Sequence, residues 1–264
     1  MVTLAMAAAL AAASPTPGVQ ANADPAIFQV QDGDTKVYIF GTFHALDGKS
    51  DWFNDEVRNA FDESGELVLE TVIPGPAAVA PAARPTGLPG PHVTASASFL
   101  GTTRMAINAG KSQGLSVGNG ADMVLRRAAD DAGKAVEGLE TLDSQLAMFA
   151  RMPARTSAKA GPAGTSAPQA DMPALSKVMI DMQDAWKRGE LTIFIRMLDQ
   201  LRRSSPDLYR TMFTERNSRW ADWIAARMQT PGTVFVAVGA GHLAGKDSVL
   251  VRLAEMGIES TRLN

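Results

Sequence analysis

The sequence predicts an α/β fold: a central mixed, mostly parallel sheet flanked by helices, with two βαβ-like ends and helical insertions between them. Residues 37–40 (VYIF) and 234–238 (VFVAV) are short runs of β-branched and aromatic residues, a pattern typical of parallel strands buried on both faces. Each run is followed by a glycine-containing turn and then by helical periodicity, which is the order of a β-loop-α unit. At 264 residues the chain is long enough for one large domain with a substantial core.

The N-terminal half is predicted to open with a hairpin and to continue as a βαβ unit. Residues 27–30 and 36–40 are joined through 31–34 (QDGD), whose Asp-Gly pair is a strong signal of a tight turn. Apolar residues at helical spacing over 53–61 predict a helix. Residues 66–70 (ELVLE) then predict a second buried strand that ends in a carboxylate.

Helical patterns dominate the rest of the chain, with short strands between them. We expect, in order, a helix over 121–132, a strand over 135–139, a helix capped by Thr141, a helix that begins at Ser205-Pro206-Asp207, a strand over 233–238, a loop over 239–242, a helix near 247–256 and a closing strand around 260–263. The tryptophans and methionines are assigned to core packing.

Two stretches rich in Pro, Ala and Gly, near 74–92 and 155–170, are predicted to be loops because their prolines and glycines suit neither a helix nor a central strand. His92 lies in the first of them. We interpret it as an exposed loop histidine without a role, because such a loop offers little to hold a ligand rigidly.

The N-terminus resembles an export signal. Residues 2–13 are rich in Ala, Leu and Met, and Ala21-Asn22-Ala23 fits a small-residue cleavage site, although the positively charged segment that usually opens such signals is missing. We therefore expect a signal peptide over 1–23, an α/β domain over 24–264, and an exported protein that is periplasmic or extracellular. A disordered Ala-rich N-terminus without a targeting role is the alternative.

Composition excludes several kinds of partner and site. A net charge of -3 and a pI near 5.7, without a strongly basic run, argue against nucleic acid as a partner. The mature chain has no apolar stretch of membrane-spanning length. The absence of cysteine excludes disulfides, a Cys-type zinc site and a thiol nucleophile. A Gly-x-Ser-x-Gly nucleophile elbow is also absent from the sequence.

The strongest functional signal is a pair of Gly-x-x-His motifs. His44 and His242 each follow a predicted parallel strand, and the chain has only three histidines. The carboxyl ends of parallel strands meet at one edge of an open sheet, where ligands bind, so the two histidines are expected to meet there. Gly41, Gly239 and Gly241 are candidate binding positions, since glycine permits positive φ and close approach of a ligand or neighbouring chain.

Histidine and carboxylate together indicate a metal centre. His44, His242 and Glu70 are candidate ligands of a divalent ion (manganese, cobalt or zinc), and three protein ligands leave positions open for water and substrate. An open metal lowers the pKa of its bound water and polarises a carbonyl, as hydrolysis requires. Glu140 is a candidate further ligand, base or partner that orients a histidine.

Glu215-Arg216-Asn217 is the remaining candidate motif. Arg216 could stabilise a developing oxyanion or bind a substrate carboxylate, with Asn217 as a hydrogen-bond donor. An exposed Glu-Arg pair on a helix face, without a role, is an equally good interpretation of the motif alone.

Taken in order, these motifs resemble the TraB/GumN family, whose members include the TIKI-type metalloproteases. The resemblance runs from about residue 24 to 263 and rests on 41–44 (GTFH), 67–70 (LVLE), 138–141 (GLET) with Gln145, 215–217 (ERN) and 238–243 (VGAGHL). It implies a metal-dependent catalytic centre on two pseudo-equivalent α/β halves. His44, Glu70 and His242 would be its catalytic or metal-binding residues, and Glu140, Arg216 and Asn217 its supporting groups. The Pro/Ala/Gly-rich stretch after Glu70 departs from the helical cover that the resemblance implies.

These inferences lead us to expect an exported metal-dependent hydrolase, a peptidase above all, that acts on a peptide or protein substrate through a metal-activated water. One alternative is a non-catalytic protein of the same fold that binds haem or a metal. Another is a metal-free esterase with His44 or His242 as its base.

Overall fold

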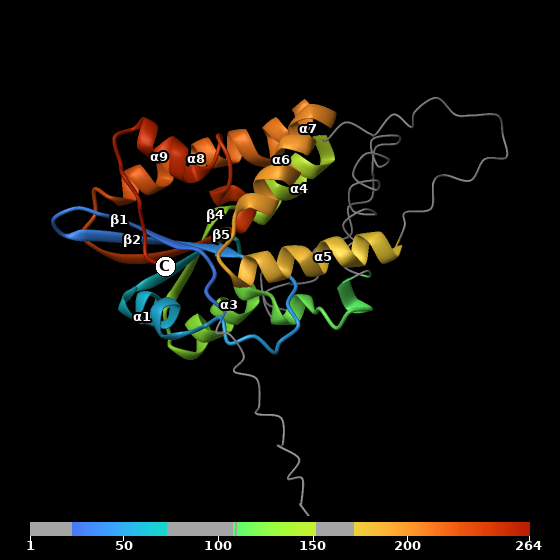
Figure 1. Cartoon of the computed structure of the whole chain (residues 1–264). Helices are drawn as coiled ribbons and strands as arrows, with labels where there is room; N and C mark the ends of the chain where they lie inside the picture. The colour runs from blue at the N-terminus through green and yellow to red at the C-terminus, as the bar shows by residue number, and fades with distance from the viewer. Residues whose placement is uncertain (1–22, 73–107, 109, 152–171) are drawn as a thin grey trace, which may run out of the picture.

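A computed structural model shows a six-stranded sheet between two layers of helices (Figure 1). It describes residues 23–72, 108, 110–151 and 172–264. The strands lie in the order β4-β3-β5-β2-β1-β6. Their bounds are β1 Ile27–Gln31, β2 Thr35–Thr42, β3 Glu66–Thr71, β4 Ala135–Glu140, β5 Gly232–Gly239 and β6 Thr261–Arg262. The expected signal peptide, both Pro/Ala/Gly-rich stretches and His92 lie wholly or almost wholly outside the described residues.

The sheet is mixed and mostly parallel, as predicted. Strands β2, β5, β3 and β4 pair in parallel, whereas β1 pairs antiparallel with both β2 and β6. The predicted hairpin is confirmed, because the Asp32 carboxylate accepts the backbone N–H of Thr35 across the turn. Both ends of the chain contain β-α-β crossovers. They differ in detail, since β5 lies between β2 and β3, while β2 and β1 lie between β5 and β6.

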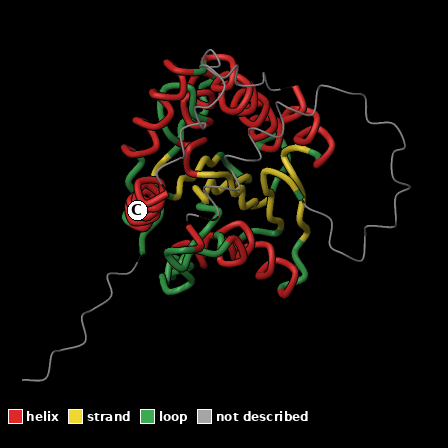
Figure 2. The backbone as a smooth tube through the Cα atoms, turned by 90° about the vertical axis from the view of Figure 1, so that its right-hand side faces the viewer, coloured by secondary structure: helices red, strands yellow, loops and turns green. Residues whose placement is uncertain are grey.

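Helices cover both faces of the sheet (Figures 1 and 2). Alternating residues of β2 divide the core: Tyr38 and Phe40 belong to one buried cluster, and Val37 and Ile39 to the other. Helices α1 (Asp55–Glu63), α3 (Ala121–Asp131) and α5 (Met172–Lys187) contribute to the first cluster, and α8 (Glu215–Arg227) and α9 (Val249–Glu255) to the second. Burial on both faces explains why these strands are apolar without alternation.

The predicted long helix after Ser205 is divided. Pro206–Tyr209 form the short helix α7, Arg210–Thr214 form a π-helix, and α8 follows. Helix α6 (Thr192–Ser204) precedes this assembly, and α4 (Leu142–Arg151) lies beside it in Figure 1. The expected helix after Thr141 is confirmed, because the Thr141 hydroxyl accepts the backbone N–H of Ser144 and caps α4.

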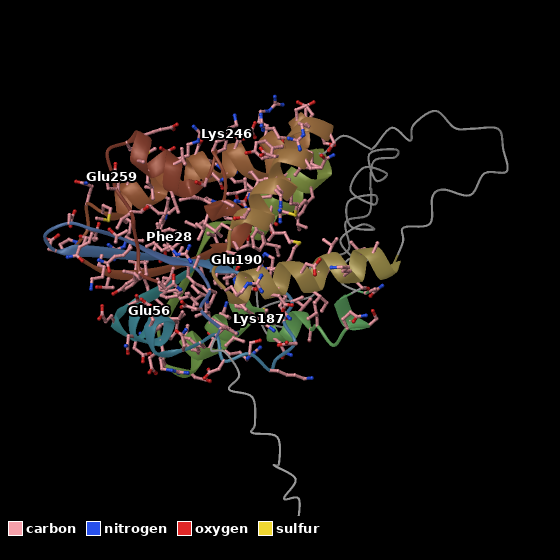
Figure 3. All side chains as sticks on the ribbon, viewed as in Figure 1. Phe28, Glu56, Lys187, Glu190, Lys246 and Glu259 are labelled. Carbon is pink, nitrogen blue, oxygen red and sulfur yellow. The ribbon has the colours of Figure 1, made fainter. Side chains whose placement is uncertain are left out.

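Charged side chains gather on the outer sides of the helix layers, as Lys246 and Glu259 illustrate (Figure 3). Within the described ranges, no helix combines the length and the apolar character that a bilayer span would need.

Candidate functional site

The two Gly-x-x-His motifs meet at the carboxyl edge of the sheet, as predicted. Strands β2 and β5 are neighbours, and Thr42 pairs in register with Gly239. The loop over 239–242 that the sequence predicts is a 3-10 helix over Ala240–Leu243, which carries His242. Glu70 comes to the same edge, because β3 pairs in parallel with the other side of β5.

Gly239 lies at the centre of the site. A Cβ atom there would lie 3.2 Å from Oε1 of Glu70 and 3.4 Å from Nε2 of His44. At Gly41 a Cβ would lie 3.3 Å from the backbone of Ala240, and at Gly241 it would lie 3.3 Å from the Phe213 ring. Close approach therefore requires these glycines. Of the two properties of glycine that the sequence analysis named, close approach is the one used here: neither Gly41 nor Gly239 has a positive φ, and φ of Gly239 is -54°.

His242 is buried, at 5% exposure, and both of its ring nitrogens have partners. Nδ1 lies 2.6 Å from Oδ1 of Asn217, and Nε2 lies 3.3 Å from Nη1 of Arg216. Because Arg216 can only donate, Nε2 is the acceptor and Nδ1 carries the proton that Asn217 accepts. Burial, with a smaller contribution from the charge of Arg216, lowers the pKa of His242 to about 3 against the attraction of Glu70. The ring is therefore neutral at neutral pH.

Arg216 joins the members of the site. Its Nε donates to both carboxylate oxygens of Glu140 at 3.0 and 3.1 Å, and its Nη2 donates to Oε2 of Glu70 at 2.8 Å. The guanidinium also lies over the Trp220 ring, 4.5 Å from its centroid, and the residue is only 3% exposed. The interpretation of Arg216 as part of an exposed Glu-Arg pair is therefore wrong.

Glu70 is held in its ionised form. Burial would raise its pKa, but His242, which is protonated in the acidic range where Glu70 titrates, and Arg216, then His44 and the backbone N–H of Gly239, lower it to about 2. That N–H donates to Oε1 at 2.7 Å. Both carboxylate oxygens of Glu70 therefore already accept hydrogen bonds.

His44 forms a dyad with Asp122, which the sequence analysis did not single out. Its Nδ1 lies 3.1 Å from Oδ1 of Asp122, in the first turn of α3, and the imidazole is 60% exposed. Desolvation lowers the pKa of His44, but the hydrogen bond and charge of Asp122, helped by Glu70, outweigh it and raise the pKa to about 9. Asp122 fixes Nδ1 as a donor, so Nε2 faces Gly239 and the site.

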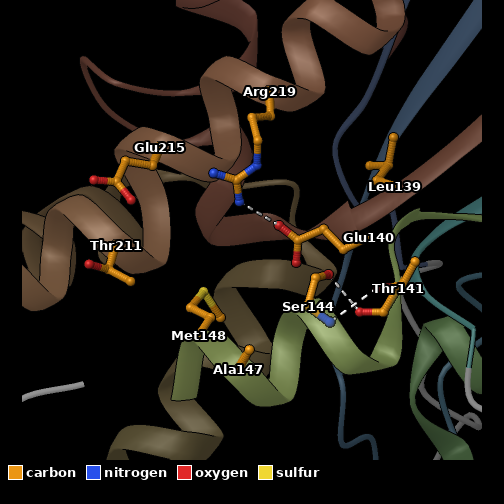
Figure 4. A pocket seen from close by; sticks show the side chains of 9 residues that line it. All are labelled: Leu139, Glu140, Thr141, Ser144, Ala147, Met148, Thr211, Glu215 and Arg219. Atoms are coloured by element: carbon orange, nitrogen blue, oxygen red, sulfur yellow. Dashed lines mark hydrogen bonds and ion pairs between the residues drawn. The ribbon is translucent and has the colours of Figure 1, made fainter. Parts of the chain in front are cut away.

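Glu140 and Asn217 hold other residues of the site in place. Glu140 does not contact either histidine; it binds Arg216 and, through Oε1, Arg219 at 3.1 Å (Figure 4). Asn217 donates its amide to the backbone oxygen of Asp247 at 2.7 Å, which orients its Oδ1 toward His242. The predicted supporting residues thus hold the groups that form the site.

The predicted metal donors converge, but the described arrangement does not fit a resident divalent ion. Within the described residues, no three His, Asp or Glu side chains are placed to hold one. Nε2 of His242 accepts from Arg216, which puts a guanidinium charge where a cation would bind. The positive charge of Arg216, whose Nη1 lies 3.3 Å from Nε2, would repel a metal ion bound to that nitrogen.

A cavity of about 460 Å³ opens above these groups. Its polar floor is His44, Glu70, Arg216 and His242, and its walls are mostly apolar. The apolar wall includes Phe43, Val117, Phe149, Met179, Met182, Phe194, Met197, Met212, Phe213 and Ala240. Assignment of all methionines to the core is therefore wrong, because four of them line this cavity. They come from three separate helical segments, so the sequence gave no signal that they line one cavity.

The comparisons with known proteins agree with the motifs. The family model described as TraB/PrgY/gumN family matches residues 26–89 and 95–262. Comparison with curated proteins and with solved structures gave no match. Because the family match spans nearly all of the sheet and every group of the site, the chain belongs to the TraB/PrgY/gumN family.

Proposed function

We propose that the protein is a hydrolase that cleaves a peptide or ester bond next to a bulky apolar group, with His44 as its general base. The observation that carries this proposal is the His44–Asp122 dyad, whose free Nε2 faces the cavity beside Gly239. An imidazole oriented by a carboxylate, with its other nitrogen open to substrate, is the arrangement that general-base catalysis needs.

Each proton in the proposed reaction has a place. Nε2 of His44 removes a proton from water, and the resulting hydroxide adds to the substrate carbonyl. The tetrahedral intermediate then breaks its bond to the leaving nitrogen or oxygen, which takes the proton from His44. Arg216 supplies positive charge at the cavity floor, next to the developing oxyanion, and also holds Glu70 and His242 in place.

The cavity walls support the choice of substrate. Aromatic rings and methionine side chains surround a small polar floor, so a ligand gains most free energy by burying an apolar group above the histidines. Methionine is flexible and polarisable, which favours tolerance of several apolar shapes. A peptide or protein substrate with a large apolar side chain beside the scissile bond meets these conditions.

The divalent metal and the export of the protein stay predictions from the sequence. A metal ion on His44 would compete with the proton that Asp122 stabilises, and one on His242 would compete with Arg216. Activity that survives a chelator would support the dyad alone. Activity that requires added manganese, cobalt or zinc would support the metal-dependent peptidase.

The test is the pH dependence of kcat/KM on a fluorogenic peptide library, with and without chelator. Because the base must lose its proton, kcat/KM should rise about tenfold per pH unit below pH 9 and level off above it. His44→Gln should abolish turnover. Asp122→Asn should lower the plateau of kcat/KM above pH 9, where His44 is deprotonated in both proteins, because the imidazole loses the carboxylate that orients it. Asp130→Asn, on the same helix but paired with Arg126 at the surface, is the matched control. Binding of haem or metal without turnover would instead support the binding protein.

A further inference from the structure

A second cavity, of about 620 Å³, lies between α4 and the helical segment over 206–227 (Figure 4). Polar and charged residues make up a larger share of its lining than in the first cavity, beside the apolar side chains of Leu139, Ala147 and Met148. Its lining consists of Leu139, Glu140, Thr141, Ser144, Ala147, Met148, Thr211, Glu215 and Arg219. None of the predicted roles assigns this cavity a ligand.

The two cavities adjoin each other. Consecutive residues on both walls divide between them: Ser144 lines the second cavity and Gln145 the first, and the same holds for Thr211 and Met212. Because successive residues of a helix point only about 100° apart, such neighbours can line two adjacent cavities. Both cavities are thus bordered by α4 and by the segment over 206–227. Glu140 lies at their boundary, with Arg216 of the first cavity on one side and Arg219 of the second on the other.

Arg219 is available to a ligand. Its side chain is 57% exposed, and among the described residues it pairs with Glu140, which accepts a hydrogen bond from Nη2. Glu140 does not depend on that bond, because Arg216 already donates to both of its oxygens. The cavity contains one further charged residue, Glu215. Its Oε1 lies 3.4 Å from Nε of Arg210. The cavity therefore offers a guanidinium whose planar N–H groups match a carboxylate.

We infer that the second cavity binds a carboxylate group through Arg219, with the hydroxyls of Thr141 and Thr211 beside it. Nε of Arg216 and Nη2 of Arg219 both contact Oε1 of Glu140, so they lie within about 6 Å of each other, roughly one to two residues of extended peptide. Because the two cavities adjoin each other, a carboxylate bound at Arg219 can belong to the substrate itself or to a separate small anion. The inference stands whether or not the protein turns its ligand over.

The test is calorimetric titration in the His44→Gln background, so that no turnover is expected. The probes are N-acetyl-phenylalanyl-alanine as the free acid, the same dipeptide as its C-terminal amide, and acetate. We expect the acid to bind at least about tenfold more tightly than the amide, because charge-assisted hydrogen bonds to Arg219 are lost in the amide. Arg219→Gln should abolish this preference, and Arg219→Lys should restore part of it.

Arg188→Gln is the matched control, since Arg188 is a similarly exposed arginine with one carboxylate partner away from the cavity. It should leave the preference unchanged. If both acetate and the amide compete with the acid for binding, the carboxylate belongs to the ligand that occupies the first cavity. If acetate competes with the acid and the amide does not, the second cavity binds a separate anion. Equal binding of acid and amide, or a preference that survives in Arg219→Gln, would overturn the inference.

Discussion

Arg216 should carry an unusually large share of the stability of the site, and Arg216→Met tests this directly. The guanidinium is 3% exposed and neutralises two carboxylates, Glu70 and Glu140, that are themselves largely buried. Removing one partner of a buried ion pair costs about 3–5 kcal/mol, because the other charge stays buried without compensation. Loss of the contact with Trp220 adds roughly 0.5–1 kcal/mol.

At about 2–4 °C per kcal/mol for a chain of this size, the melting temperature should fall by roughly 7–24 °C. The assay is urea unfolding at pH 7 together with thermal unfolding. Arg219→Met is the matched control: Arg219 binds the same carboxylate but is 57% exposed, so its loss should cost less than about 1 kcal/mol.

A second variant separates charge from packing. Adding Glu70→Gln and Glu140→Gln to Arg216→Met removes the uncompensated charges and should recover most of the lost stability. If Arg216→Met is no more destabilising than Arg219→Met, or if the glutamine substitutions recover nothing, the account of Arg216 as the charge that holds the site together is wrong.

Three further predictions concern the same groups. Asp122→Asn should lower the pKa of His44 from about 9 toward its ordinary value, as followed by NMR titration of its imidazole, and an unchanged pKa would contradict the dyad. The free energy of unfolding should fall as pH drops from about 6.5 to 3, because His242 takes up its proton at a higher pH in the unfolded chain than in the folded chain. It should fall further from about 4.5 toward 2, because the same is true of Glu70. Urea midpoints across this range check both, and His242→Gln should flatten the first part of the profile. Gly239→Ala should reduce activity far more than Gly33→Ala. A Cβ atom at Gly239 would press on Glu70 and His44, whereas none of the described atoms lies within 4 Å of a Cβ atom at Gly33. Equal activities of the two variants would refute the close-approach argument.

The sequence was sufficient for the parts of the fold and site that depend on local pattern. Strands β2, β3 and β5 are uninterrupted apolar runs because both of their faces are buried, and that pattern placed His44, Glu70 and His242 at one edge. Parallel pairing then made their convergence predictable without coordinates.

Other parts of the site depend on packing between distant segments. Asp122 belongs to a helix whose sequence shows only an acidic first turn, and nothing local relates it to His44. The four methionines of the cavity wall carry the same apolar signal as core methionines. The burial of His242 and Arg216 was likewise hidden, because polar residues are usually exposed unless a partner elsewhere in the chain satisfies them.

The π-helical turn over Arg210–Thr214 makes the spacing of this segment rigid in a way that a loop would not. A π-turn holds one residue more than an α-helical turn. Deletion of a single residue there would let the segment relax to regular α-helix and rotate everything on one side of it by about 100° relative to the other. A deletion before Phe213 would then turn both Phe213, which contacts the His242 ring, and Arg216, which contacts its Nε2, away from His242. In this helix the length of the chain is therefore as strict a requirement as the identity of its residues.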